Sequence, residues 1–301
     1  MSWLDRTALL IGDDAVNQLK NSKVAIVGLG GVGGSAAEAV CRMGVGTLIL
    51  VDNDTVDDTN RNRQLFATAE TVGMDKVNAA LQRLRALNPE ANFIVKKEFY
   101  LPENSDFLFD LQPDLVLDAI DTVTAKLHLA KTCKEKDIPL VCCLGTGNRV
   151  DPSQLRWGDI SQTAGCGCPL AKVMRRELKK RDVTQQTVIY SVEEPHKAIV
   201  GESEHGRHSP ASCAFVPPAA GCLLASAGIR LLLEKHQYHL EDQDLPFGRS
   251  FLCIKFLLLP TLLANSLEVA SCFPLFFPDW SMVCWEQAAE FWRLQYFKDK
   301  V

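Results

Sequence analysis

The sequence lacks the paired metal knuckles and the leader segment that would place it at once in a common class. Its eleven cysteines include one C-x-C but no matched pair of C-x-x-C motifs, so we expect no structural zinc site. The first residues, M-S-W-L-D-R, have no apolar core of signal-peptide length, which predicts a cytoplasmic protein that is not secreted. A net charge of −5 argues against nonspecific nucleic-acid binding by the whole surface, so any such partner must meet a local basic patch.

Long apolar runs are scarce as well. The run over residues 251–264 is broken by Lys255 and Pro260 and is too short to cross a bilayer, so we expect no stable membrane span. The cysteines are scattered over the whole chain, which is typical of small buried side chains rather than of disulfides. With 301 residues, of which 47% are hydrophobic, the chain has ample material for a soluble core.

The stretch over residues 23–63 is the most informative part of the chain. A continuous apolar run over residues 24–27 breaks into four closely spaced glycines, Gly28, Gly30, Gly31 and Gly33, and then into small residues at helical spacing. This pattern predicts a strand, a tight turn and a helix start, whose backbone N–H groups favour a phosphate. We expect the helix to stop at Gly44 and a second strand to cover residues 47–51, with Asp52 at its carboxyl end, where dinucleotide folds place an acid on ribose hydroxyls.

Charged and amide side chains follow this acid closely. They are Asp54, Asn60, Arg63, Gln64 and, further on, Lys76. A nicotinamide cofactor presents only a pyrophosphate, which the helix start already covers, whereas a nucleoside triphosphate carries more charge to hold. Arg63 and Lys76 are therefore candidate catalytic residues that grip phosphates, as nucleotidyl or phosphoryl transfer requires.

The order of elements predicts an α/β fold of the Rossmann type. Helices are expected over residues 74–87 and 124–137 and strands over 93–95, 114–118 and 138–144, with Asp118 and Asp121 at the carboxyl end of the second of these strands. This alternation predicts a mostly parallel sheet with helices on both faces. Additional strands over 155–160 and 187–190 flank a helix over 169–180, and a largely apolar helix over 219–234 closes an ATP-binding domain of residues 1–235. Residues 236–301 form a linker and an apolar tail of unknown role.

Two further segments carry charge whose use is open. Residues 3–20 are expected to form a helical arm with Leu9, Leu10 and Val16 packed inward and with Arg6 in a mobile lead-in, where a solvated charge is the simplest interpretation. The helix over 169–180 and the residue after it carry six cations against Glu177. A solvated helix face is the commoner explanation, and contact with nucleic-acid backbone is the alternative. These cations are Lys172, Arg175, Arg176, Lys179, Lys180 and Arg181.

With these residues in place, the chain resembles the ubiquitin-activating-enzyme-like adenylyltransferase superfamily, through G-L-G-G-V-G, V-D-N-D, N-R-N-R-Q, G-M-D-K-V and D-A-I-D. Within it, the chain is most similar to the tRNA threonylcarbamoyladenosine dehydratases, through R-T-A-L-L-I-G, D-I-S-Q-T before C-P-L-A-K-V, and S-C-A-F-V-P-P-A-A-G. The resemblance implies that the glycines bind phosphates, that Asp52 binds ribose and that Asn60, Arg63 and Lys76 bind the triphosphate. It also implies that Asp121 binds Mg²⁺ and that Arg6 reaches the ATP of the other subunit of a homodimer.

The function that this resemblance implies is an ATP-dependent dehydration of threonylcarbamoyladenosine beside the anticodon of a tRNA. The threonyl carboxylate would be adenylated, and an atom of the carbamoyl group would then close a ring and release AMP. The alternative is an adenylyltransferase for a ubiquitin-like sulfur carrier, with a sulfur-transfer protein as a possible partner. The missing C-x-x-C pairs count against this alternative. An oxidoreductase is disfavoured by Asn60, Gln64 and the cations near them. A non-catalytic binding module would leave Arg63, Lys76 and Asp121 dispensable.

Overall fold

The computed structural model describes residues 2–196, 211–236 and 238 of the chain. The chain divides into two compact units, Met1–Leu240 and Glu241–Val301. The second unit lies wholly outside the described residues, as does the predicted apolar tail apart from residues 236 and 238. The predicted domain boundary at residue 235 therefore stays a prediction.

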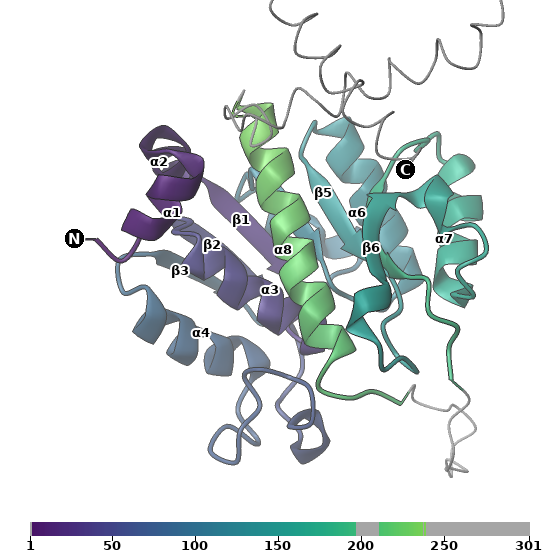
Figure 1. The fold of residues 1–301 in the computed structure, drawn as a ribbon, viewed down its shortest axis with the longest axis horizontal. Coiled ribbons are helices and arrows are strands. Elements are labelled where there is room, and N and C mark those ends of the chain that lie inside the picture. The colour runs from purple at the N-terminus through teal and green to yellow at the C-terminus, as the bar shows by residue number, and fades with distance from the viewer. Residues whose placement is uncertain (1, 197–210, 237, 239–301) are drawn as a thin grey trace, which may run out of the picture. The chain divides into compact units, whose positions relative to one another are not determined.

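A seven-stranded sheet forms the centre of the first unit, with the strand order β3-β2-β1-β4-β5-β7-β6 (Figure 1). All neighbouring strands run parallel except β6 and β7, which pair antiparallel. The predicted Rossmann-like α/β fold is confirmed. The strands are β1 (Lys23–Val27), β2 (Thr47–Val51), β3 (Asn92–Lys96), β4 (Leu115–Asp118), β5 (Leu140–Cys143), β6 (Leu155–Asp159) and β7 (Thr187–Ser191).

The register of the central strands brings their carboxyl ends to one edge of the sheet. Val27 of β1 lies beside Val51 of β2 and Asp118 of β4, and Asp118 lies beside Cys142 of β5. The loops that follow these four strands therefore emerge together. This is the edge at which open parallel sheets bind their ligands.

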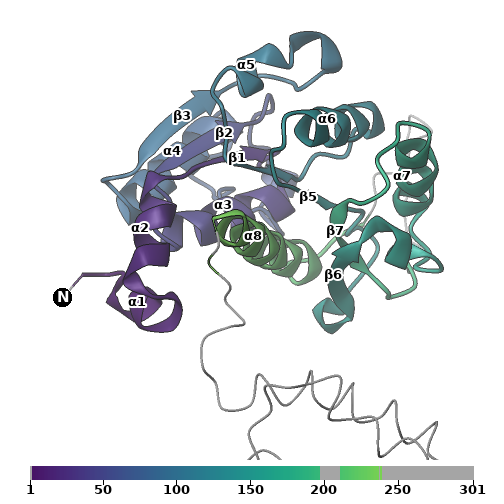
Figure 2. The same cartoon turned by 90° about the horizontal axis from the view of Figure 1, so that it is seen from above.

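Helices cover both faces of the sheet, as predicted (Figure 2). Because neighbouring side chains of a strand point to opposite faces, Val24 and Ile26 of β1 join one hydrophobic core while Ala25 and Val27 join the other. The first core is completed by α1 (Asp5–Ile11), α2 (Asp13–Asn21), α3 (Gly31–Arg42), α4 (Lys76–Leu87) and α8 (Val216–Lys235). The second is completed by α5 (Asp106–Phe109), α6 (Val123–Glu135) and α7 (Pro169–Lys179).

The helix α8 is an element of the core. Among the described residues it is the one helix long and apolar enough to cross a membrane by length and composition. Its most apolar 18-residue window is nevertheless 61% buried inside the protein, where it packs against α3 and the sheet. Buried core helices commonly reach such hydropathy, so α8 is weak evidence for a membrane span.

The amino-terminal arm differs from its prediction. It forms two helices separated by Gly12 rather than one. Val16 is buried as predicted, but Leu9 and Leu10 are 87% and 74% exposed, so the prediction that they pack inward is wrong. The helical phase restarts after Gly12, and α1 buries Ile11 instead.

Candidate active site

The predicted glycine turn connects β1 to α3. The N–H of Gly28 donates to the carbonyl of Val51 at 2.8 Å, which ties the turn to β2. A Cβ atom at Gly33 would lie 1.7 Å from the carbonyl oxygen of Gly28, so this close approach requires a glycine. A Cβ atom at Gly30 would meet only the side chain of Gln64, at 3.9 Å. The turn is therefore tightly closed toward the sheet and open on the side of Gln64.

A chain of polar contacts runs from the glycine turn to Lys76. Asp52 accepts a hydrogen bond from the N–H of Leu29 in the turn at 2.7 Å and another from the N–H of Asp54 at 2.9 Å. The Asp54 carboxylate in turn pairs with Nζ of Lys76 at 2.7 Å. The Lys76 side chain is 10% exposed, whereas that of Asp54 is 59% exposed. Asp52, Asp54 and Lys76 thus lie together beside the turn, as the sequence predicted.

Arg63 and its neighbours form the other side of this region. Asn60 ends a short helical turn, η1 (Asp58–Asn60), and its Oδ1 accepts from the N–H of Asp57 at 3.2 Å. Nη1 of Arg63 donates to the Thr59 carbonyl at 3.1 Å and to Oδ1 of Asn62 at 2.8 Å. Both acceptors are uncharged, so neither compensates the positive charge of the guanidinium, which can therefore pair with an anionic ligand.

Arg63 also lies directly against the glycine turn. A Cβ atom at Gly31 would lie 3.4 Å from Cγ of Arg63. A shallow cavity of about 200 Å³ lies beside this contact, and Ser35 of α3, Arg61, Arg63, Gln64 and Pro218 are among the residues that line it. The two predicted binding segments therefore meet in space.

The two acids after β4 have different surroundings. The sequence placed both Asp118 and Asp121 at the ligand edge, but Asp118 is fully buried and only Asp121 is exposed. The Asp118 carboxylate pairs with Nζ of Lys126 on α6 at 2.9 Å, which explains why it turns away from solvent. Asp121 stays a candidate metal ligand, because Mg²⁺ is often held by one carboxylate together with phosphate oxygens and waters. Within the described ranges no group of three or more His, Cys, Asp or Glu side chains could hold a metal.

Lys126 and Arg149 are buried cations that the sequence analysis missed. Nζ of Lys126 also donates to the carbonyl of Cys143 at 2.7 Å, so it connects α6, β4 and β5 at the ligand edge. Burial alone would lower the pKa of Lys126, but the Asp118 carboxylate outweighs this and raises it. Arg149 lies in the loop after β5 and is 3% exposed. Neither residue stands in a recognisable motif, and only the fold brings their partners together.

None of the described cysteines whose pKa is shifted has an activated thiol, because in each of them the pKa is raised. Six described cysteines, Cys41, Cys133, Cys142, Cys143, Cys166 and Cys168, are buried and unbridged, as predicted. Cys213 is half-buried and Cys222 is exposed, so for these two the prediction of burial is wrong. Burial raises the pKa of Cys133 and of Cys143 to about 12. These thiols stay protonated at neutral pH, and nucleophilic cysteines require the thiolate.

The basic helix α7 presents fewer free cations than its sequence suggests. Arg175 turns inward and donates to the carbonyl and hydroxyl of Thr163, at 2.7 and 2.6 Å. Lys180, Arg181 and Arg176 converge on Glu177 and lower the pKa of its carboxyl to about 2. The remaining two, Lys172 and Lys179, are exposed.

Arg6 lies on the outward side of α1. It is exposed, and within the part of the chain that the structure describes no contact joins it to the glycine turn. Residues three and four positions apart share a helix face, so Arg6 lies on the same side as the exposed Leu9 and Leu10. The predicted contact between Arg6 and the ATP of another subunit stays a prediction.

Comparison with known proteins gives a consistent result. The chain matches the ThiF family over residues 4–249. It is 42% identical over 240 residues to the tRNA threonylcarbamoyladenosine dehydratase of Bacillus subtilis, which covers 76% of this chain and 94% of that protein. It is also 37% identical over 124 residues to the adenylyltransferase and sulfurtransferase uba4 of Aspergillus niger, which covers 41% of this chain and 26% of that protein.

Solved structures are similar over the same region. The crystal structure of Escherichia coli tRNA N6-threonylcarbamoyladenosine dehydratase in complex with AMP matches with a TM-score of 0.70 and 30% sequence identity. That match covers 77% of this chain and 94% of the other. The complex of the same enzyme with ATP matches with a TM-score of 0.69.

Proposed function

Because the chain belongs to the ThiF family, we propose that it is an enzyme that dehydrates threonylcarbamoyladenosine in tRNA with the use of ATP. The observation that carries this proposal is the match to the Bacillus subtilis dehydratase, which extends over 94% of that protein. The site agrees with it, because a glycine turn, an acid and two cations gather at the ligand edge of the sheet. The similarity to uba4, over 26% of that protein, is much less extensive.

The reaction needs charge neutralisation and positioning more than covalent chemistry from the protein. A carboxylate oxygen of the threonyl group forms a bond to the α-phosphorus of ATP, and the bond to pyrophosphate breaks. An atom of the carbamoyl group then attacks the activated carboxyl carbon, AMP leaves, a proton is released, and the net change is loss of one water. Arg63 and Lys76 stabilise the charge on the phosphates, and Asp52 binds the ribose. Among the described residues Arg63 has no carboxylate partner, and the nearly buried Lys76 side chain is already held in place by Asp54, so both act at low cost in reorganisation.

Magnesium belongs to this proposal as well. Asp121 is an exposed carboxylate at the ligand edge, and its oxygens are hard ligands of the kind that Mg²⁺ prefers. When bound, the ion supplies Lewis-acid stabilisation of phosphate oxygens. Turnover that persists unchanged in excess EDTA would remove Mg²⁺ and the metal role of Asp121 from the proposal.

The decisive assay offers the protein ATP, Mg²⁺ and tRNA that carries threonylcarbamoyladenosine. Digestion of the tRNA and mass spectrometry of the nucleoside should show a loss of one water that depends on ATP. The same protein is offered a ubiquitin-like sulfur carrier in parallel. Pyrophosphate release with the carrier, and an unchanged mass with the tRNA, would favour the carrier adenylyltransferase instead.

We also propose that the active form is a homodimer in which Arg6 of one subunit reaches the ATP of the other. Its support is the exposed face of α1, where Leu9 and Leu10 leave apolar surface in water beside an arginine without a described site contact. Burying this face against a second copy would remove the apolar surface from water and carry Arg6 outward from its own subunit. The amino-terminal arm is therefore the part of the chain on which the dimer is tested.

Mixed subunits provide the test of this arrangement. Arg6→Ala and Arg63→Ala homodimers are each expected to be nearly inactive. When equal amounts are unfolded and refolded together, half of the dimers contain one site with both arginines, so activity should return to about a quarter of the wild-type level. The measurement is the dehydration rate of the mixture. A mixture no more active than its two components would mean that Arg6 does not act across an interface.

The exposed cations of α7 are proposed to contact the tRNA backbone. Lys172 and Lys179 are the two without an ion-pair partner among the described residues, so they carry the proposal. Exchanging both for glutamate should weaken tRNA binding and reduce the slope of log K against log salt by about one for each phosphate that is no longer bound. Arg85→Glu, an exposed change on α4, is the control. Equal tRNA binding by the α7 variant and the control across a salt titration would leave α7 a solvated helix face.

A further inference from the structure

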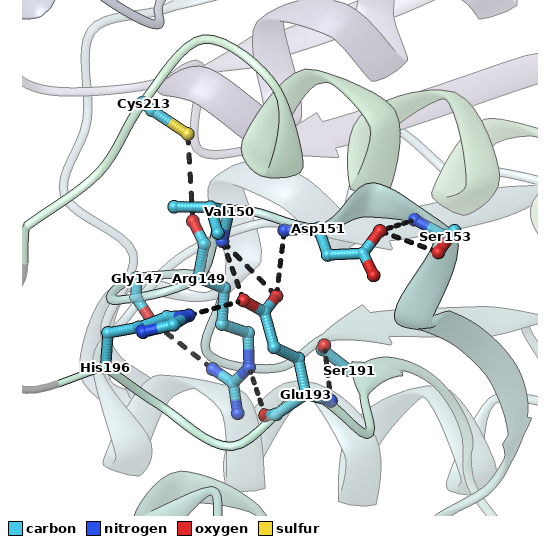
Figure 3. Close-up of polar contacts among 9 residues, drawn as sticks. All are labelled: Gly147, Arg149, Val150, Asp151, Ser153, Ser191, Glu193, His196 and Cys213. Carbon is cyan, nitrogen blue, oxygen red and sulfur yellow. Dashed lines mark hydrogen bonds and ion pairs between the residues drawn. The ribbon is translucent and has the colours of Figure 1, made fainter.

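Arg149 is a buried cation whose side-chain hydrogen-bond partners among the described residues are all neutral groups. Its Nε donates to the backbone carbonyl of Glu193 at 3.2 Å and its Nη1 to that of Gly147 at 3.3 Å (Figure 3). Nη1 also donates to the backbone carbonyl of Gly145 at 2.7 Å. The remaining nitrogen, Nη2, is buried and has no hydrogen-bond partner among the described residues. Three donor contacts therefore fix the plane of the guanidinium, and its last edge stays unused.

The carboxylate in the same cluster forms no ion pair with Arg149 in the described part of the chain. Glu193 accepts from the N–H groups of Val150 and Asp151, each at 3.0 Å, and from Nε2 of His196 at 3.0 Å (Figure 3). Although burial alone would raise the pKa of Glu193, these hydrogen bonds lower it, so the carboxyl stays ionised and engaged. A buried charge without a counter-charge is costly. An anion that approached Nη2 would relieve this cost.

The Arg149 loop is joined to the nucleotide-binding residues by the segment 211–213. Sγ of Cys213 lies 3.7 Å from the carbonyl oxygen of Arg149. On the other side of the segment, Nδ2 of Asn62 donates to the carbonyl of Ser212 at 3.0 Å, while Oδ1 of the same Asn62 accepts from Arg63 at 2.8 Å. The loop that holds Arg149 follows β5, at the same sheet edge as the glycine turn. Arg149 thus belongs to the surroundings of the active site and not to a distant part of the core.

We propose that Nη2 of Arg149 binds the threonyl carboxylate of the substrate nucleoside, an inference that rests on the function proposed above. The reaction brings a carboxylate anion to a triphosphate that is itself strongly anionic, which is electrostatically unfavourable without an additional cation. Arg63 and Lys76 are engaged by the phosphates. A guanidinium edge suits a carboxylate oxygen, and one oxygen held by Arg149 leaves the other to attack phosphorus.

The test compares two tRNAs that differ only in the carboxylate-bearing group. Equilibrium binding is measured, without ATP, for the same tRNA with threonylcarbamoyladenosine and with plain adenosine at that position. A charge-assisted hydrogen bond predicts that the wild-type protein prefers the modified tRNA by about tenfold or more. Arg149→Gln should reduce this ratio to about one and leave the affinities for unmodified tRNA and for ATP unchanged.

Arg156→Gln is the matched control, because Nη1 of Arg156 also donates to backbone carbonyls, those of Ser153 and Leu155 at 2.7 Å each, but on the exposed surface. This variant should keep the preference. If Arg149→Gln lowers the melting temperature, Arg149→Lys serves as the second variant. It keeps the charge but lacks the planar fork of the guanidinium. Its one nitrogen cannot replace Nε and Nη1 at the three carbonyls and also Nη2 at a carboxylate, so it should lose the preference too.

Four results would overturn the inference. They are a preference that persists in Arg149→Gln or in a folded Arg149→Lys, a wild-type protein without any preference, equal weakening of both tRNAs, and weakened ATP binding. Equal weakening would indicate a tRNA phosphate as the bound anion, and weakened ATP binding would indicate the nucleotide. Absence of dehydration by the wild-type protein contradicts the proposed function itself, whereas wild-type turnover with an intact preference in Arg149→Gln contradicts only the role of Arg149.

Discussion

Arg63→Ala is expected to lower the rate of dehydration by about 10²- to 10³-fold, which is the usual loss when one preorganised donor is removed from a developing negative charge. Arg63 lies against the glycine turn, and its described partners, the Thr59 carbonyl and Asn62 Oδ1, are both exposed neutral groups. Its removal therefore leaves no buried charge unpaired. The melting temperature should stay within the range of surface variants. The measurement is single-turnover conversion of modified tRNA at saturating ATP.

The neighbouring Arg61 provides the control for this experiment. Arg61 is also exposed and cationic, but Nη1 of Arg61 pairs with Asp58 at 2.6 Å, so its charge is already compensated. Arg61→Ala should retain nearly full turnover. If Arg63→Ala turned over at the rate of Arg61→Ala, the triphosphate would be held by other residues and the assigned role of Arg63 would be wrong.

Lys126→Met is expected to lower the free energy of unfolding by about 3–5 kcal/mol, because it leaves the fully buried Asp118 carboxylate without its counter-charge. The pair is 0% exposed on both sides, so solvent cannot replace the missing partner. Lys131→Met on the same helix removes an exposed pair with Glu135 instead and should cost less than about 1 kcal/mol. The measurement is the midpoint of urea unfolding.

A double variant shows whether the loss of stability in Lys126→Met comes from an unpaired charge or from poorer packing. Adding Asp118→Asn to Lys126→Met removes the unpaired charge and should restore part of the stability, whereas poorer packing alone would make the double variant no better than the single one. The direction of the Lys126 pKa gives the pH dependence. A raised folded pKa means that the contribution is complete below the unfolded pKa and is lost only as pH rises through the folded value. The contribution of Lys126 to the stability of the wild-type protein should therefore be the same at pH 6 and at about pH 8.

Elements are predicted best from the sequence where one local pattern decides the structure. The strand over residues 47–51 was predicted with the bounds of β2, and the helix before it ends next to Gly44, which has a φ of 81°. A continuous apolar run and a glycine in the left-handed region are local properties that need no partner. The family resemblance read from the motifs is confirmed as well, by the match to the ThiF family over residues 4–249.

Features that depend on distant partners could not be predicted in this way. Leu9 and Leu10 look like core residues, but the break after α1 turns them outward. The buried pair joins the end of β4 to α6, and Arg149 depends on a carbonyl 44 residues later in the chain. A buried lysine or arginine and a surface one look the same in the sequence, and only the three-dimensional packing distinguishes them.

The contact between Lys76 and Asp54 also bears on how well the site is prepared for ATP. A free lysine side chain loses about 1.5–2 kcal/mol of rotamer entropy when a ligand immobilises it. Here Asp54 holds Nζ at 2.7 Å before any nucleotide arrives, and an ammonium group has two further N–H bonds to offer a phosphate. The ordering of Lys76 is thus completed during folding, so that the site is preorganised and an incoming triphosphate meets a side chain already in position.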